Sequence, residues 1–119
     1  MPEETAGIEL GPEDEKIVIL ARSARARTQA AEGAAIRDTD GRTYAACTVD
    51  LPSFSLTAIQ AAIAAAVSSG AEGIEAAAIV GAAPLFDQAS VHALRDMGGR
   101  APIFLADPSG TVQEVLRPE

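Results

Sequence analysis

Apolar residues recur at helical spacing near the start of the chain and then give way to two short apolar runs. Ile17, Leu20, Ala21 and Ala24 follow Gly11-Pro12 and an acidic first turn, which predicts a helix over about 12–27. The runs 33–37 and 42–49 flank Asp40-Gly41, a dipeptide typical of a tight hairpin turn. Two antiparallel strands are therefore expected after the first helix.

Residues 54–69 form a segment whose middle, residues 58–67, is apolar except for Gln60. Ser53 or Ser55 is a suitable N-cap and Gly70 a suitable stop, so the segment is predicted to be a helix. A helix that is apolar all round is buried on all sides. In a chain of 119 residues, this implies either a central helix between the sheet and its neighbours or one face buried in a contact between subunits.

The rest of the chain alternates between strand and helix signals. Strands are expected at 74–80, 101–106 and 111–116, and a helix at about 87–97 with Asp87 as its N-cap. Turn-forming residues at 107–110 imply that the last two strands pair antiparallel. The element order is α-β-β-α-β-α-β-β, and right-handed crossovers favour a parallel centre of the first, third and fourth strands. The predicted fold class is α/β with a five-stranded mixed sheet.

Acidic residues are concentrated at the N-terminus of a chain whose formal net charge is -8. Six of the 17 acidic residues and none of the nine basic ones lie in residues 1–15, so the remainder is nearly neutral. We expect residues 1–11 to be a disordered acidic tail and residues 12–119 to form one domain. The overall acidity argues against DNA binding. Five arginines form a candidate basic patch for an anion or RNA: Arg22, Arg25, Arg27, Arg37 and Arg42. The alternative is that Arg22, Arg25 and Arg27 are only the solvated end of the first helix.

A single cysteine, Cys47, excludes an intrachain disulfide and a cysteine-rich zinc site. It alternates with Ala45 and Val49 on one strand, which favours a buried small side chain. For His92, one helical turn before Asp96, we expect a structural or surface role. No apolar run approaches the ~20 residues of a membrane-spanning helix, and the acidic N-terminus is unlike a signal peptide. A cytoplasmic protein that does not contact a membrane is expected.

The order of elements resembles that of the small cytidine deaminases. Residues 21–24 followed by Gly33-Ala34-Ala35-Ile36 resemble the family's first helix running into its first strand. Residues 101–110 resemble the strand and turn that follow its second catalytic helix. Thr48 and Asp50 stand where the family has an Asn-x-Glu pair that binds the ribose. The resemblance covers about residues 12–116 and implies a three-layer α-β-α fold.

The zinc signature of that family is missing. Such a deaminase holds zinc through a Cys or His at the start of one helix and Pro-Cys-x-x-Cys at the start of another, and a Glu moves protons. The resemblance implies the first ligand at Thr57, the other two at Asp87 and Ser90, and the Glu at Ile59. The aromatic substrate-binding segment is also shortened, to residues 28–32. We therefore expect no catalytic residue, no bound metal and no cofactor.

Three functions stay open. The missing ligands and the apolar segment 54–69 favour a catalytically inactive deaminase-fold protein that acts through assembly, as a homodimer or homotetramer formed through that segment. A second hypothesis is a nucleoside- or RNA-binding module whose degenerate pocket is formed by Thr48, Asp50, Thr57, Asp87 and Ser90. The third is an active enzyme, either a cytidine deaminase with unusual ligands or another hydrolase.

Overall fold

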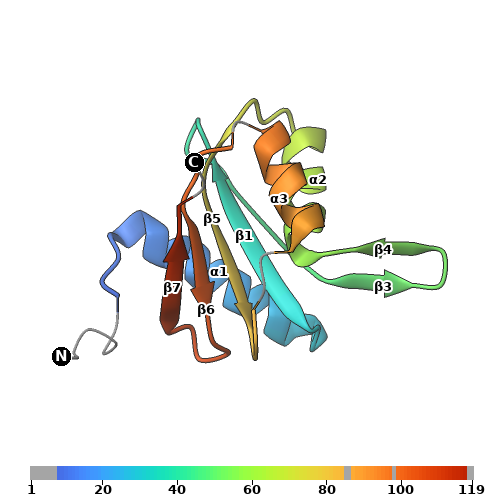
Figure 1. The fold of residues 1–119 in the computed structure, drawn as a ribbon, viewed down its shortest axis with the longest axis horizontal. Helices are drawn as coiled ribbons and strands as arrows, with labels where there is room; N and C mark the ends of the chain where they lie inside the picture. Colours follow the sequence, from blue (N-terminus) through green and yellow to red (C-terminus); the bar gives the residue numbers. More distant parts are fainter. Residues whose placement is uncertain (1–7, 85–86, 98, 118–119) are drawn as a thin grey trace.

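A mixed five-stranded sheet separates one helix from two others, as a computed structural model of residues 8–84, 87–97 and 99–117 shows (Figure 1). α1 covers one face of the sheet, and α2 and α3 cover the other. The elements are α1 (Pro12–Thr28), β1 (Glu32–Asp38), β2 (Thr43–Cys47), β3 (Val49–Leu51), β4 (Phe54–Leu56), α2 (Ala58–Ser68), β5 (Ile74–Gly81), α3 (Gln88–Asp96), β6 (Ile103–Ala106) and β7 (Val112–Leu116). The expected α/β class and three-layer arrangement are confirmed.

The strands of the main sheet lie in the order β2-β1-β5-β6-β7. β5 and β6 run parallel, whereas β1 pairs antiparallel with both β2 and β5. The expected parallel centre of three strands is therefore wrong. The helical crossover through α2 starts from β2 rather than β1, so β2 and β5 run in the same direction with β1 between them. The last two strands pair antiparallel, as predicted.

Alternate residues of the central strands supply two cores, because successive side chains of a strand point to opposite faces. Ala35 and Ala78 pack with Ile17 under α1, whereas Ile36 and Ile79 pack on the face covered by α2 and α3. Small side chains let α1 approach closely. A Cβ atom at Gly33 would lie 2.1 Å from the carbonyl oxygen of Ala21.

The predicted helix over 54–69 is wrong at its start, because α2 begins only at Ala58. Residues 54–56 are strand β4, which pairs with β3 around Pro52-Ser53 to form a separate two-stranded sheet. Phe54 and Leu56 alternate with Ser55, and this period suits a strand better than a helix. Neither Ser53 nor Ser55 caps the helix. Thr57 does so, because its Oγ1 accepts the Gln60 N–H and Gln60 Oε1 accepts the Thr57 N–H, both at 3.0 Å.

A buried carboxylate holds the turn between β1 and β2, where Asp40-Gly41 predicted one. Asp38 accepts hydrogen bonds from the backbone N–H groups of Asp40 and Arg42 and from the Tyr44 hydroxyl, each at 2.9 Å. Burial alone raises the pKa of Asp38, but these three hydrogen bonds together bring its pKa below the ordinary value. The turn therefore depends on an ionised Asp38.

Two further predictions concern the acidic tail and the burial of Cys47. Of the expected acidic tail, residues 1–7 lie outside the described residues. Cys47 is half-buried rather than buried, since it lies on β2, the outermost strand on its side of the sheet. Its Sγ accepts a hydrogen bond from Thr28 Oγ1 at 3.2 Å.

Candidate functional site

Two helices begin next to each other, and a pair of hydroxyl groups joins them. Thr57 caps α2, and Asp87 caps α3 by accepting the Ser90 N–H at 2.9 Å, as expected for Asp87. Thr57 Oγ1 and Ser90 Oγ lie 3.0 Å apart and share a hydrogen bond across 33 positions of sequence. Ser90 is 2% exposed. Three residues that the resemblance assigned to a zinc site are thus brought together.

These donors do not fit zinc. Protein zinc sites use thiolate, imidazole and carboxylate ligands, whereas Thr57 and Ser90 offer two neutral hydroxyls that bond to each other. Of the three residues, Asp87 alone offers a carboxylate, and its Oδ1 accepts the Ser90 N–H as a helix cap. At the position of the proton-carrying Glu, Ile59 is 1% exposed and packs in the core. Among the described residues, no group of three His, Cys, Asp or Glu could hold a metal ion.

Thr48 and Asp50, assigned to the ribose, lie close to Thr57. Thr48 Oγ1 accepts the N–H of Glu32 at 3.1 Å and donates to its carbonyl oxygen at 3.2 Å, so this side chain ties the end of β2 to β1. Asp50 lies exposed on β3, where its carboxylate accepts a hydrogen bond from Ser55 Oγ at 3.4 Å. The exposed carboxylate is the more accessible of the two groups to a ligand.

Two hollows meet at Thr48 and Thr57. One has a volume of about 430 Å³, and its remaining lining residues are Arg25, Ala31, Glu32, Ala82 and Ala83. The other, of about 250 Å³, reaches Asp50 and Gln60 along the base of the β3–β4 hairpin. Asp87 and Ser90 line neither of these two hollows. The residues of the predicted degenerate pocket are therefore divided between these places. Thr57 is the one residue that both lines the two hollows and belongs to the hydroxyl pair.

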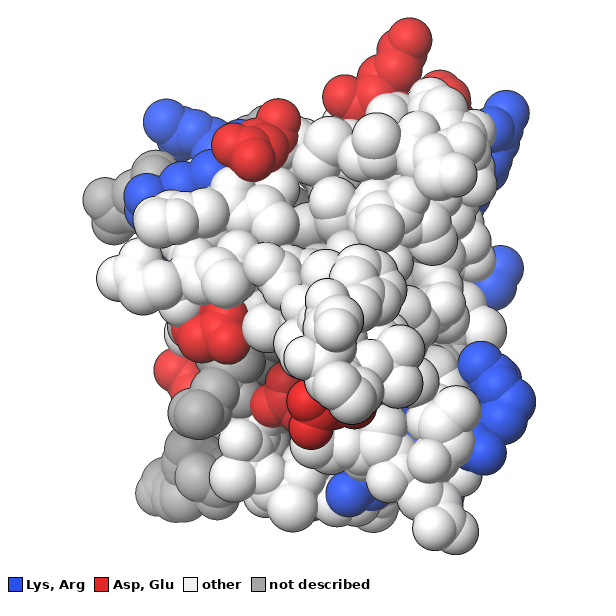
Figure 2. All heavy atoms as spheres, turned by 90° about the vertical axis from the view of Figure 1, so that its right-hand side faces the viewer, with Lys and Arg blue, Asp and Glu red and all other residues white. Residues whose placement is uncertain are grey.

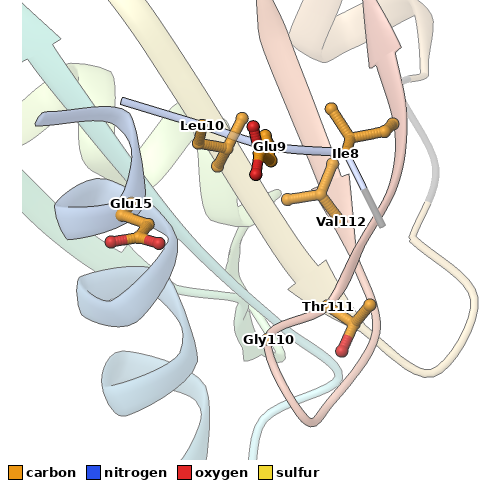
Figure 3. Close-up of a pocket in the computed structure, with 7 residues that line it drawn as sticks. All are labelled: Ile8, Glu9, Leu10, Glu15, Gly110, Thr111 and Val112. Atoms are coloured by element: carbon orange, nitrogen blue, oxygen red, sulfur yellow. The ribbon is translucent and has the colours of Figure 1, made fainter. Parts of the chain in front are cut away.

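A larger hollow, of about 600 Å³, lies elsewhere (Figure 3). It is bounded by residues 8–10, by Glu15 of α1, and by the turn and first residue of β7 at 110–112. None of the residues predicted to bind a ligand lines it. Its carboxylates, Glu9 and Glu15, make it an unsuitable place for an anionic ligand.

The five arginines of the candidate basic patch are not assembled into one surface. Arg37 is nearly buried in β1, where it forms ion pairs with Asp14 at 3.0 Å and Glu75 at 2.7 Å. Arg42 belongs to the turn at the far end of β1 from the C-terminus of α1. Three arginines, Arg22, Arg25 and Arg27, remain together on α1, and Arg25 Nε already donates to the carbonyl oxygen of Ala31 at 3.2 Å.

Sequence reasoning missed both Gln60 as a capping partner and the hairpin beside it. The signal for Gln60 was present in the sequence, because Thr57-Ala-Ile-Gln60 matches the spacing of a capping box.

His92 is exposed on α3, in agreement with the expected surface role. Within the described residues, no helix combines the length and apolar character that crossing a membrane requires.

Comparison with solved structures shows the same fold in cytidine deaminases. The enzyme from Burkholderia pseudomallei has 23% sequence identity and a TM-score of 0.73 over 86% of this chain and 90% of that one. The enzyme from Mycobacterium leprae has 23% identity and a TM-score of 0.66 over 83% and 90%. The enzyme from Mycobacterium tuberculosis has 25% identity and a TM-score of 0.58 over 81% and 88%.

Sequence comparison gives a family match as well. No curated protein matches the chain. The sequence model described as cytidine deaminase-like matches residues 10–110, which include all three helices and most of the main sheet. The chain therefore belongs to the cytidine deaminase-like family.

Proposed function

We propose that this chain is a non-catalytic member of the cytidine deaminase-like family that acts through assembly or binding. The observation that carries the proposal is the Thr57–Ser90 hydroxyl pair at the start of α2 and α3. Zinc-dependent deamination of cytidine requires a metal-activated hydroxide and a carboxylate that moves protons to the base. The first turns of these helices supply a hydrogen bond between neutral groups instead.

Conversion of the site to catalysis would need more than one new ligand. Because α2 has no Cys, His, Asp or Glu along its length, it offers no proton carrier in any register. A Glu at position 59 would have to ionise in the apolar core where Ile59 now lies, and an unpaired buried charge is costly. The packing around Ile59 thus supports the same conclusion as the hydroxyl pair.

A direct assay tests this proposal. The purified protein is incubated with zinc and cytidine, and uridine formation is followed by chromatography, with a solved family enzyme as the positive control. We expect no uridine above the uncatalysed background. Uridine formation that a chelator abolishes and added zinc restores would refute the proposal.

One observation favours binding of a small polar ligand as a second candidate function. The hollow at Thr48 and Thr57 places hydroxyls beside the apolar surface of Ala82 and Ala83. A pocket of this kind suits a nucleoside, whose base is flat and whose sugar carries hydroxyls. Thermal unfolding with and without cytidine, uridine and a short RNA tests the idea. A melting temperature unchanged by all three at millimolar nucleoside would exclude it.

A further inference from the structure

The outer edge of β2 is a row of backbone groups with which no other strand of the described chain pairs. Two hydrogen bonds at the ends of the β1–β2 pair show which groups face outward. The Asp38 N–H donates to the Arg42 carbonyl oxygen at 2.8 Å. At the other end, the Thr48 N–H donates to the Glu32 carbonyl oxygen at 3.0 Å. Since bonded and non-bonded positions alternate in an antiparallel pair, the backbone groups of the even-numbered residues of β2 point toward β1.

The odd-numbered residues of β2 therefore direct their N–H and C=O groups outward: Thr43, Ala45 and Cys47. Within the described residues, these outer groups form no backbone hydrogen bond to another part of the chain. Ala45 is exposed, and the rest of the strand is half-buried. Natural edge strands avoid pairing with other chains through charged residues or proline. β2 has neither, whereas the opposite edge strand, β7, carries Glu114.

α1 and α2 lie over the two faces of this edge. The Thr28 Oγ1 of α1 bonds to Cys47 on one face of β2, and Tyr44 and Ala46 pack with the core under α2 on the other. A strand added to the edge would continue the sheet between these helices, and its alternate side chains would face α1 and α2 in turn. Because α2 carries no charge from Ala58 to Ser68, the side chains that face it should be apolar.

Basic residues lie at both ends of the edge. Arg42 directly precedes β2, and Arg27 precedes Thr28 beside its other end; both arginines are exposed. Figure 2 views the molecule from the side of the sheet on which β2 lies, where the middle of the face is mostly uncharged and basic residues line its right-hand edge. The strand rises by about 17 Å between Arg42 and Cys47. Acidic residues five or six positions apart in an extended peptide match this spacing.

The same charges disfavour a second copy of the chain as the occupant. Two β2 strands that paired about a two-fold axis at Ala45 would run antiparallel. Arg42 of each copy would then lie near Arg27 of the other, and like charges at an interface cost affinity. A peptide with acidic ends places opposite charges at both positions instead. Charge complementarity therefore selects an acidic partner.

We propose that β2 binds an extended acidic segment of another protein, which adds a sixth strand to the main sheet. Main-chain hydrogen bonds to Thr43, Ala45 and Cys47 hold such a segment, and the side chains at its ends give the specificity. An Asp or Glu near each end pairs with Arg42 and Arg27. The inference rests on the proposed function, since it names the kind of partner that the chain binds.

Fluorescence anisotropy with a labelled seven-residue peptide tests the pairing on the full chain. The peptide has a glutamate at each end and alternating valine and threonine between them, so that its valines share one face. We expect saturable binding that weakens about fivefold or more when salt is raised from about 0.05 M to about 0.5 M. The same peptide with lysine in place of both glutamates should bind about tenfold more weakly.

Variants of the chain separate backbone pairing from charge. Ala45→Pro removes an outward N–H but no hydrogen bond to β1, and should weaken binding about tenfold. Ala45→Thr keeps the N–H and should bind like the wild type. Arg42→Glu and Arg27→Glu should each weaken binding about fivefold. Arg22→Glu is the matched control on α1 and should not, because Arg22 lies beside Gly110 in the turn between β6 and β7, away from β2.

Circular dichroism checks that each variant is folded. If Ala45→Pro is not, a peptide with alternate backbone nitrogens methylated makes the same test from the other strand and should not bind. The proposal would be overturned by a wild type that does not bind the acidic peptide, or by equal binding to folded Ala45→Pro. A loss in Arg22→Glu as large as in Arg27→Glu would also overturn it.

Sedimentation velocity without peptide tests the competing occupant. A wild-type dimer that Ala45→Pro dissociates would overturn the proposal, because a second copy would then occupy the edge. These outcomes are separate from the uridine assay, since an active enzyme can bind the peptide and an inactive protein can fail to bind it.

Discussion

Removal of the Thr57 hydroxyl tests the hydroxyl pair most closely. Thr57→Val keeps the branched shape but cannot accept the Gln60 N–H or bond to Ser90. Loss of an N-cap costs about 1 kcal/mol. Leaving the buried Ser90 hydroxyl without this partner adds roughly 1–3 kcal/mol. We therefore expect the free energy of unfolding to fall by about 2–4 kcal/mol, and the melting temperature to fall by roughly 10 °C.

A double-mutant cycle separates the bond from the cap. Ser90→Ala removes the bond but leaves Thr57 capping α2, so it should cost about 1 kcal/mol. In the double variant the unpartnered hydroxyl is gone, and the loss should be smaller than the sum of the single losses by roughly 1 kcal/mol or more. Urea unfolding measures all four free energies.

A threonine at the surface supplies the control for this cycle. Thr39→Val changes the same atoms at an exposed position and should alter the free energy of unfolding by less than about 0.5 kcal/mol. Additive losses for Thr57→Val and Ser90→Ala would refute the reasoning, because they would show that the two hydroxyls do not interact.

Three further predictions follow from the packing, the turn and the site. Gly33→Ala should lower the free energy of unfolding in urea by about 1–3 kcal/mol or more, because the new Cβ would meet the Ala21 carbonyl oxygen at 2.1 Å; unchanged stability would contradict this packing. The pKa of Asp38 is lowered in the folded state, so the stability that Asp38 contributes is complete above the ordinary pKa of an aspartate and is lost as the pH falls through the folded-state pKa. In Asp38→Asn, the melting temperature should therefore fall less steeply with decreasing pH than in the wild type. An identical pH profile in the two proteins would contradict the role of an ionised Asp38 in the turn. Replacing Thr57, Asp87 and Ser90 together by Cys should create a site that binds Co²⁺ with thiolate absorption bands, and no such bands in the folded variant would show that the three positions do not converge.

The fold was predictable where one element carries its own signals. Asp87 as a helix cap, Asp40-Gly41 as a turn and the antiparallel last strand pair were each predicted from local chemistry and are confirmed. The resemblance to cytidine deaminases also led to the correct fold, because it summarised the whole order of elements rather than any single motif.

The errors arose where a long-range pairing decides the structure. Phe54-Ser-Leu56 joins directly onto an apolar helix, so composition alone merged the two, and only pairing with β3 separates them. The direction of β1 relative to β5 depends on which strand the helical crossover leaves. The contact between Thr57 and Ser90 likewise depends on how α2 and α3 pack. The resemblance placed both residues at one site, but the bond between their side chains is visible only in three dimensions.

Zinc content is the most direct measure of whether hydroxyls have replaced a metal site in this chain. The untagged protein is dialysed with zinc, freed of unbound metal by gel filtration and subjected to elemental analysis, with Ser90→Ala measured in parallel. Our account predicts far less than one zinc per chain in both proteins. One zinc per chain in the wild type, lost in Ser90→Ala, would contradict the account and would make the start of α2 and α3 a metal centre.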